Sequence, residues 1–434
     1  MADSSVMSER KESGPVFAGV VLVLLFLFLY NINFTFLPLI TSRIVLLVGV
    51  LYGMFMAVRG VRFSMSRDMA IVLIFGILSV GYSLVNLFFH GFSDPSLTKG
   101  TALVLLHSAF GGFFFALLFS KGRYEFRGVV KMLHAAITLQ AVFIVLFFVS
   151  AGFREFNLDY IVTNSNLIPS ASSFRSRGIA GSYGASLALV QSFGLLFGGY
   201  LIVSWSDRLS ERIYLVASFV LIVASVMLTG RTGLLMLPVV LLYFALVAYK
   251  GPKGLKSGIL PFFLISGSLV LGLFGLKFGA ALLSRADSAE RFNSLLNWIA
   301  MEVIVTDDGI RFYTLDVLLK QVFFPDQWNL VVFGDPATWD LHRVPSDIGP
   351  IRLLFGSGVL GTVLFYMSFI VLFFSLVQSI DGYREKLFLG LLCVFLLVTE
   401  FKEPFLMKVN VNSYLFILFF YLQLSKPGVV KGLQ

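Results

Sequence analysis

The chain has 434 residues, of which 58% are hydrophobic and only 13% are charged. Soluble domains carry about 25% charged residues, so this composition excludes an ordinary soluble protein. The formal net charge is +9, but the basic residues fall in short segments between apolar stretches and not in one patch. We therefore expect a membrane protein with no nucleic-acid partner.

Apolar stretches long enough to cross a bilayer recur along the whole chain. A spanning helix needs about 20 apolar residues, and the alternating pattern of barrel strands is missing. We predict an all-α integral membrane protein with about 12 transmembrane helices in a single polytopic domain, residues 1–434. The helices are predicted to begin near Val16, Phe36, Met69, Leu97, Val129, Ile179, Ile213, Thr232, Gly258, Ile348, Lys386 and Val411.

The first apolar run does not read as a cleaved signal peptide. A polar leader, MADSSVMSERKESG, precedes it, and it ends in LYNINFTF without a small-residue cleavage site. We expect this helix to be retained. The single cysteine, Cys393, excludes an intrachain disulfide and a cysteine-based metal site.

Basic residues give the predicted helices one orientation. Lys and Arg concentrate in short cytoplasmic loops, and one alternating topology places more than half of the 33 Lys and Arg residues on one side. We predict that both termini lie on this cytoplasmic side. The residues assigned to it are Arg10, Lys11, Arg59, Arg62, Arg67, Lys121, Arg123, Arg127, Lys131, Arg208, Arg212, Lys250, Lys253, Lys256, Arg384, Lys386, Lys426 and Lys431.

The same topology leaves two sizeable loops outside, residues 152–178 and 279–347. The second is rich in Trp and Phe, which argues against disorder, and loops of this length are usually functional. It contains a predicted amphipathic helix that Asp308 would cap and Pro325 would end. The predicted apolar stripe is Ile310, Tyr313, Val317 and Leu318. Such a helix would lie on the membrane surface and roof a cavity.

Arginine is common on the outer side, although the positive-inside rule disfavours it there. The tight turn LTGRTGLL, with Arg231, is the clearest case. One interpretation is a residue that snorkels to the interface. The other is an anion contact, because the planar guanidinium pairs with phosphate oxygens and stays charged. The outer arginines are Arg43, Arg154, Arg175, Arg177, Arg231, Arg285, Arg291, Arg311, Arg343 and Arg352.

Histidines are few. His107 and His134 fall inside predicted helices with no acid nearby in sequence, and structural hydrogen bonding is the favoured interpretation of both. Because an ionisable residue inside a membrane is by default a functional hypothesis, His107 stays open. His342 differs, since it lies in LHRVPSD beside Arg343 and close to Asp347.

Motifs of soluble enzymes are missing. The chain has no Walker-type phosphate loop, no HExxH and no GxSxG. No spacing suggests a metal site, and we expect no metal or other cofactor. Glu400 and Glu403 in TEFKEPF, with Lys402 between them, are interpreted as a solvated ion cluster at an outer helix end.

Four stretches, in order, resemble motifs of the bacterial O-antigen polymerase (Wzy) family, part of the O-antigen ligase/polymerase superfamily. They are RSRGIAGSYGASLALVQ, LTGRTGLL, RFYTLDVLLKQVFFPDQWNLVVFGDP and SDIGPIRLLFGSGVLG, within residues 175–361. The chain departs from the family at Ala185 and Ser186, where many members have Pro-Asn. Asp347 and Ile348 stand where the ligases tend to carry His-Asn, which favours the polymerase branch.

The resemblance implies a GT-C-like glycosyltransferase in the bacterial inner membrane, with a periplasmic active site. A growing glycan would leave undecaprenyl pyrophosphate and join the terminal sugar of a new undecaprenyl-pyrophosphate-linked repeat, without a metal. A flippase and a chain-length regulator are the implied protein partners. The alternatives are an O-antigen ligase that acts on lipid A core, a lipid-linked oligosaccharide flippase, and a non-catalytic scaffold.

Roles for individual residues follow from this chemistry, since preorganised cations aimed at developing charge often give the largest catalytic term. Asp347 and His342 are the candidate bases for the acceptor hydroxyl. Asp347 would alternatively cap the helix at Ile348, and both roles can hold at once. A side opening between helices is expected to admit the polyprenyl tail. The residues assigned to the pyrophosphate are Arg177, Arg231, Arg311 and Arg352, with Arg43, Arg343 and Arg175 as further choices.

Overall fold

The structure is a computed structural model. It describes residues 14–162, 175–182, 184–204, 208–250, 267, 293–297, 303–306, 309–339, 346–426 and 429–431. Within these residues the chain is an all-α membrane protein, apart from four short strands. Eight of the described helices are long and apolar enough to cross a membrane, and the apolar helices at the two ends of the chain are shorter.

The first part of the chain forms one helix after another. Its elements are α1 (Pro15–Tyr30), α2 (Thr41–Val58), β1 (Arg62–Phe63), α3 (Arg67–Phe89), α4 (Ser96–Leu103), a π-helical turn (Val104–Ala109), α5 (Phe110–Lys121), α6 (Phe126–Val149), α7 (Ala151–Tyr160), α8 (Ala185–Val203), α9 (Leu209–Thr229), a 3₁₀ helix (Arg231–Leu235) and α10 (Met236–Lys250). Because α4, the π-helical turn and α5 are continuous, they make a single span, Ser96–Lys121.

The second part contains the remaining strands and the last long helices. Its elements are β2 (Val303–Thr306), β3 (Gly309–Phe312), α13 (Tyr313–Lys320), α14 (Trp328–Phe333), a 3₁₀ helix (Pro336–Trp339), α15 (Gly349–Gln378), α16 (Tyr383–Glu400), a 3₁₀ helix (Phe405–Met407), α17 (Val409–Leu424) and β4 (Val430–Lys431). The helix expected near Gly258 lies outside the described residues, so the count of about twelve stays a prediction.

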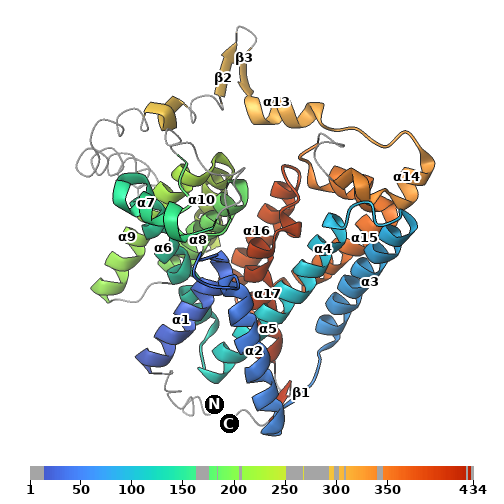
Figure 1. Cartoon of the computed structure of the whole chain (residues 1–434). Helices are drawn as coiled ribbons and strands as arrows, with labels where there is room; N and C mark the ends of the chain where they lie inside the picture. Colours follow the sequence, from blue (N-terminus) through green and yellow to red (C-terminus); the bar gives the residue numbers. More distant parts are fainter. Residues whose placement is uncertain are drawn as a thin grey trace.

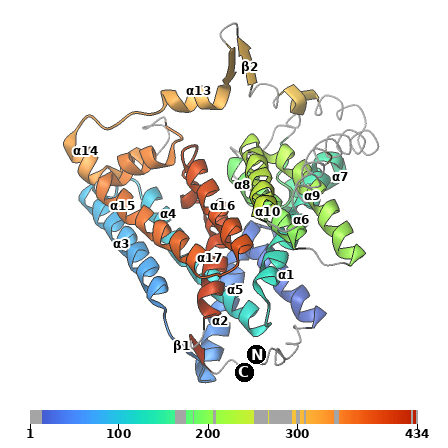
Figure 2. The same ribbon diagram turned by 180° about the vertical axis from the view of Figure 1, so that it is seen from behind.

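The two ends of the molecule differ in what they carry. At one end β1 pairs with β4, and Lys426 Nζ lies 3.5 Å from Asp68 Oδ2. We call this the sheet end. Figures 1 and 2 place β2, β3, α13 and α14 at the opposite end, which we call the loop end. α2 and α17 both run from the loop end toward the sheet end.

The helices form two groups, and α17 lies between them. Figures 1 and 2 show α3, α4, α14 and α15 on one side and α6, α8, α9 and α10 on the other. α8 and α17 are buried on nearly every face. Helices that are apolar all round belong in the interior of a bundle. The buried positions of α8 and α17 therefore agree with their apolar sequences.

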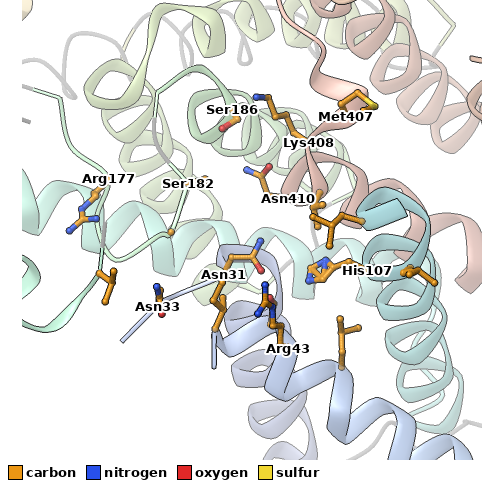
Figure 3. A pocket seen from close by; sticks show the side chains of 18 residues that line it. Asn31, Asn33, Arg43, His107, Arg177, Ser182, Ser186, Met407, Lys408 and Asn410 are labelled. Carbon is orange, nitrogen blue, oxygen red and sulfur yellow. The ribbon is translucent and has the colours of Figure 1, made fainter. Parts of the chain in front are cut away.

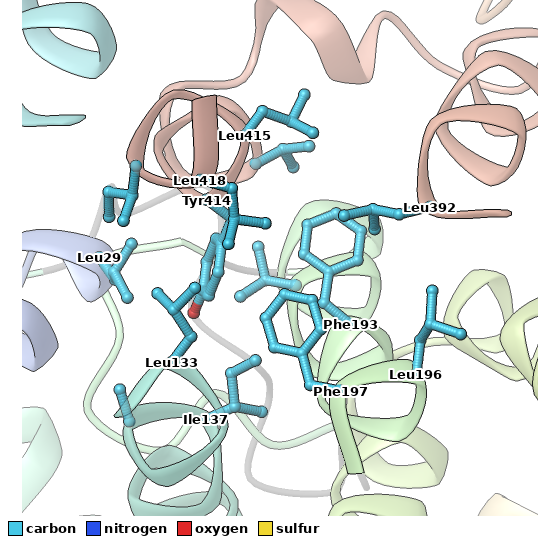
Figure 4. Packing of buried hydrophobic residues seen from close by; sticks show 14 of the residues in the cluster. Leu29, Leu133, Ile137, Phe193, Leu196, Phe197, Leu392, Tyr414, Leu415 and Leu418 are labelled. Atoms are coloured by element: carbon cyan, nitrogen blue, oxygen red, sulfur yellow. The ribbon is translucent and has the colours of Figure 1, made fainter. Parts of the chain in front are cut away.

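Aromatic rings join α8 to α17 in the core. Tyr414 of α17 packs against Phe193 and Phe197 of α8, at ring-centroid distances of 5.6 and 6.1 Å (Figure 4). The Tyr414 hydroxyl lies 3.3 Å from that of Tyr30, which accepts a hydrogen bond from Gln191. Buried polar groups are costly unless they are paired, and here each hydroxyl has a partner.

The segment between α1 and α2 is extended, although the sequence pattern predicted a helix from Phe36. Asn31 ends α1 in the left-handed conformation, with φ of 49°. Phe34 then forms an antiparallel bridge with Ile161, just after α7. Pro38 follows, and a residue before proline disfavours helix, so α2 begins only at Thr41.

The helix predicted from Asp308 is wrong in its first half. β2 and β3 form an antiparallel hairpin there, with Val303 opposite Phe312 and Thr306 opposite Gly309. The run VIVT is β-branched and favours strand, and the pairing of Thr306 with Gly309 leaves two residues between the strands, a common hairpin length. The helix starts at Tyr313 as α13 and ends at Lys320, five residues before Pro325.

A break interrupts α15 near its start. Gly358 has φ of 61° and ψ of −175°, outside the helical region. α14 ends against this break, and a side chain at Gly358 would meet the Val332 carbonyl. Asn86 of α3 donates a 2.9 Å hydrogen bond to the Phe333 carbonyl. Because glycine tolerates positive φ without strain, the break lets α14 approach the α15 backbone.

Candidate functional site

A cavity of about 560 Å³ lies at the loop end, where several distant segments of the chain meet. It is bounded by the end of α1, the starts of α2, α8 and α17, and the π-helical turn. Figure 3 shows side chains from these elements around one space. The polar residues that matter most here are Asn33, Arg43, His107, Arg177, Lys408 and Asn410.

His107 sits in the π-helical turn and is 7% exposed. Its ring stacks on Phe28, with centroids 4.7 Å apart and an interplanar angle of 21°. Neither ring nitrogen has a hydrogen-bond partner among the residues that the structure describes. The structural hydrogen bonding favoured from the sequence is therefore wrong for His107.

His134, by contrast, is a satisfied core residue. Its Nδ1 donates to the Gly194 carbonyl at 3.1 Å, and its Nε2 lies 2.8 Å from Ser218 Oγ. A carbonyl only accepts, so the proton is on Nδ1 and Nε2 accepts from the hydroxyl. The structural role predicted for His134 is confirmed.

Arg177 enters the cavity from the segment that precedes α8. Its backbone carbonyl accepts a 2.7 Å hydrogen bond from Gln140 Nε2, and its guanidinium donates to the Asn157 carbonyl at 3.5 Å. The residue is 1% exposed. Ser176 is also fixed, because its hydroxyl donates to the Ile144 carbonyl. These bonds to α6 and α7 fix where the guanidinium lies.

Three further polar residues come from helix starts. Arg43 lies in the first turn of α2 and is exposed. Lys408 is the residue before α17, and Asn410 lies in the first turn of that helix. The Asn410 side chain is 7% exposed, and its Nδ2 has no hydrogen-bond partner among the described residues. Both helix starts place backbone N–H groups near the cavity, a favourable arrangement for anions.

The cavity is amphipathic. Leu46 of α2 and Leu103 and Leu106 of the α4 region line its apolar part. Leu106 is 68% exposed, and Leu47 next to Leu46 is also exposed. None of the described lining residues is Asp or Glu. The cavity thus joins a cationic polar part to an apolar surface that faces outward from the bundle.

A second group of predicted residues lies at the start of α15. Arg352 donates a 2.7 Å hydrogen bond to the Trp339 carbonyl, and its guanidinium lies over the Trp339 ring, 4.7 Å from the centroid. Asp347 is exposed, and its backbone N–H donates to Gln321 Oε1 at 2.9 Å. The acid and the arginine are therefore both at the loop end.

The predicted helix cap at Asp347 is wrong. The N-cap of α15 is Ile348, and no side chain caps the helix. Pro350 in the first turn lacks an N–H, which reduces the number of donors that need a cap. The carboxylate of Asp347 therefore does not cap α15.

The turn between α16 and α17 links the two groups. Glu403 lies in this turn, and its carboxylate is close enough to Lys408, Asp347 and Arg352 for electrostatic interaction. Burial raises the pKa of Glu403 above its ordinary value, while Lys408 and Lys402 oppose that shift. Lys408 also lines the cavity, so the turn connects the cavity with the start of α15.

The interpretation of Glu400 as part of a solvated ion cluster is wrong. It is 2% exposed, and it accepts hydrogen bonds of 2.9 Å from the Tyr366 hydroxyl and the Leu406 N–H. A side chain at Gly349 would meet its carboxylate. Glu400 therefore holds the α16–α17 turn against the start of α15.

Arg231 lies in the 3₁₀ helix between α9 and α10, which confirms a tight turn at this position. The next residue, Thr232, accepts a 2.6 Å hydrogen bond from Lys402 Nζ. Since Lys402 belongs to the α16–α17 turn, Thr232, the residue after Arg231, contacts that turn across the fold. Arg231 does not line the cavity.

Of the remaining predicted site residues, the structure describes only some. His342 and Arg343 lie outside the described residues. Arg311 lies in β3 opposite Ile304, and its side chain is outside the description. Arg175 is half-buried in the segment before α8.

Sequence reasoning missed Lys408 and Asn410. They lie in FLMKVNVN, which reads as the start of an apolar helix. The available signal was Lys408 itself, a basic residue at a helix end that the predicted topology places outside, where the positive-inside rule disfavours it.

A second cavity, of about 790 Å³, lies where α6 and α9 begin. Its lining includes Arg127, Lys131 and Arg208, but also Glu125 and Glu211. Arg127 pairs with Glu211 at 2.8 Å, and Lys131 lies 3.4 Å from the same oxygen. The Tyr421 hydroxyl, near the end of α17, donates to the Tyr124 carbonyl, so this cavity belongs to the sheet end.

No protein-family model and no curated protein matches the chain. Its function is therefore inferred from the residues of the site.

Proposed function

We propose that the protein is a membrane glycosyltransferase that polymerises lipid-linked saccharide repeats at its loop end. The observation that carries this proposal is the amphipathic cavity, whose polar part holds Arg43, Arg177 and Lys408 and no acid among its described lining residues. A polyprenyl pyrophosphate has the same division into an anionic head and an apolar tail. The loop end would then face the periplasm.

The cations would act on the leaving group. In the proposed reaction the bond between the anomeric carbon of the growing glycan and the pyrophosphate oxygen breaks, and negative charge develops on that oxygen. Preorganised donors at such a charge are typically worth about 10²–10³ in rate each. Arg177 is suited to this role because its backbone and guanidinium are already held by Gln140 and Asn157.

The acceptor would lie toward the start of α15. Its hydroxyl oxygen forms the new bond to the anomeric carbon, and its proton needs a base. Asp347 is the proposed base, because its carboxylate is exposed and does not cap α15. Arg352, held on Trp339, would contact the acceptor's own pyrophosphate. Both substrates are lipid-linked, and the α16–α17 turn joins the two cationic regions.

The lipid tail needs a route that stays in the bilayer. Leu103 and Leu106 line the cavity and are exposed on the outside of the bundle. A polyprenyl chain lying over this surface would remain among apolar groups while its head enters the cavity. No transmembrane tunnel is needed for this arrangement.

Deletion in a strain that builds surface polysaccharide tests the proposal. Loss of a polymerase should leave single repeats attached to lipid A core on a gel. Loss of a ligase should leave no repeat attached, and loss of a flippase should leave lipid-linked repeats inside the cell. A normal ladder of chain lengths in the deletion strain would contradict the proposed function.

A further inference from the structure

The π-helical turn presents a buried imidazole to the loop-end cavity. π-helical turns are rare and occur often at functional sites. His107 lies in this turn, is 7% exposed, and has neither ring nitrogen bonded to a described residue. Buried polar groups nearly always have a partner, so this histidine needs an explanation that His134 does not.

The ring is held in one orientation by apolar packing. Phe28 of α1 stacks on it and also fills the space beside Gly111 of α5, where a side chain would clash with the Phe28 ring. The imidazole is therefore fixed without using either nitrogen. A fixed ring with two available nitrogens is preorganised for a ligand.

A second polar group lies on the same cavity. Asn410 is also 7% exposed, and its Nδ2 donor has no partner among the described residues. Both side chains line the cavity together with Arg43, which lies within electrostatic range of the imidazole. Figure 3 shows the three residues around one space, with Lys408 beyond Asn410.

We propose that His107 and Asn410 are substrate-contacting residues that hydrogen-bond the pyrophosphate head of a lipid-linked glycan. The inference rests on the proposed function and specifies how the head is recognised. The cations Arg43, Arg177 and Lys408 supply charge, and the imidazole and amide N–H groups supply directed donors to phosphate oxygens. Leu103 and Leu106 favour a lipid-borne pyrophosphate over a free one.

The test uses His107→Phe in the full-length protein purified in detergent. Phenylalanine keeps the ring stacked on Phe28 and removes both nitrogens, so the melting temperature without ligand should stay near that of the unchanged protein. Removing one good hydrogen bond should weaken the binding of undecaprenyl pyrophosphate roughly tenfold to hundredfold. Binding is measured as the ligand-induced shift in melting temperature over a concentration series.

Three comparisons make the result specific. Asn410→Leu, which removes the amide at similar volume, should weaken binding as well. His107→Gln, which restores a donor, should recover part of the affinity. His90→Phe is the matched control, since His90 is exposed at the end of α3, away from the cavity, and should bind as the unchanged protein does.

Each outcome has a defined meaning. If His107→Phe and Asn410→Leu bind undecaprenyl pyrophosphate as tightly as the unchanged protein, the two residues do not contact the head. If inorganic pyrophosphate binds as well as the lipid, the lipid-borne ligand is wrong and a free anion is the ligand. If the unchanged protein binds neither, the substrate class of the proposed function fails together with this inference.

Discussion

The molecule has a basic cavity near each end, and the two differ in whether acids line them together with the basic residues. At the sheet end, Arg127 and Lys131 share the carboxylate of Glu211. At the loop end, Arg43, Arg177 and Lys408 line a cavity with no acid among its described lining residues. Basic residues alone therefore do not identify a site.

The difference separates two uses of positive charge. Basic residues on the cytoplasmic side orient helices during insertion, and pairing them with acids does not impair that role. A site for an anionic ligand is favoured where cations line a cavity and no acid among the described lining residues competes with the ligand. Only the loop-end cavity also combines its cations with an exposed apolar surface, formed by Leu103 and Leu106.

The largest expected effect is on Arg177. Arg177→Lys keeps the positive charge but removes the planar fork that binds two phosphate oxygens. We expect the polymerisation rate to fall by about 10²–10³, measured from the chain-length distribution on a gel at equal protein level in the membrane. Arg127→Lys at the sheet end is the matched control, and equal losses in both variants would remove the distinction between the cavities.

A smaller effect is expected from Arg43→Glu, which gives the loop-end cavity the acid that the sheet-end cavity has. Arg43 is exposed, so folding should not depend on it. Like charges placed together at an interface cost several kcal/mol, and we expect the affinity for undecaprenyl pyrophosphate to fall by at least about tenfold. Affinity that is unchanged at low salt would argue against Arg43 as an anion contact.

Glu403, which lies within electrostatic range of Lys408, gives a pH-dependent test. Burial raises the pKa of Glu403 above its usual value near 4.5. The protonated form is therefore favoured in the folded state, and its contribution to stability is lost as the pH rises through the raised pKa. Glu403→Gln resembles the protonated form, so its melting temperature relative to the unchanged protein should increase as the pH rises above 4.5. If the difference in melting temperature between Glu403→Gln and the unchanged protein does not vary with pH, burial is not the dominant influence on the pKa of Glu403.

The smallest effect is expected at the sheet end. Glu211→Gln removes the acid that Arg127 and Lys131 share, yet pairs of this partly exposed kind contribute about 0–1 kcal/mol. We expect the melting temperature to fall by roughly 2–4 °C at most, with a normal chain-length distribution. Loss of polysaccharide at normal protein level would show that the sheet-end cavity also takes part in function.

The helical part of the fold could be predicted because hydropathy reports burial in lipid directly. The apolar helices that the structure describes lie where the sequence places them, apart from shifts at their ends. The shift from Phe36 to Thr41 depends on the bridge between Phe34 and Ile161, a contact between residues more than a hundred positions apart that no local pattern reports. The hairpin of β2 and β3 differs from the predicted helix because the apolar residues from Ile310 to Leu318 also fit a helical stripe, although VIVT favours strand.

The types of residue in the candidate site could be predicted from the sequence, but which of them share one cavity could not. Arginines that the predicted topology places outside are unusual enough to notice, and Arg43 and Arg177 do line one cavity. For His107 the sequence favours structural hydrogen bonding and leaves a functional role open, because a helical position says nothing about which partners its ring finds. Lys408 and Asn410 become part of the cavity only through the turn that Glu400 holds against α15. Such a tertiary contact has no signature in a single sequence.

The pairing of β1 with β4 has a consequence for how the protein is made. Ser66, which caps α3, donates its hydroxyl to Gln423, a residue 357 positions later, and Asp68 lies beside Lys426. The start of α3 thus leaves the ribosome long before the groups that hold it exist. The early helices must wait in the membrane until α17 has been translated, and the cavity that α2 and α17 share cannot form before then.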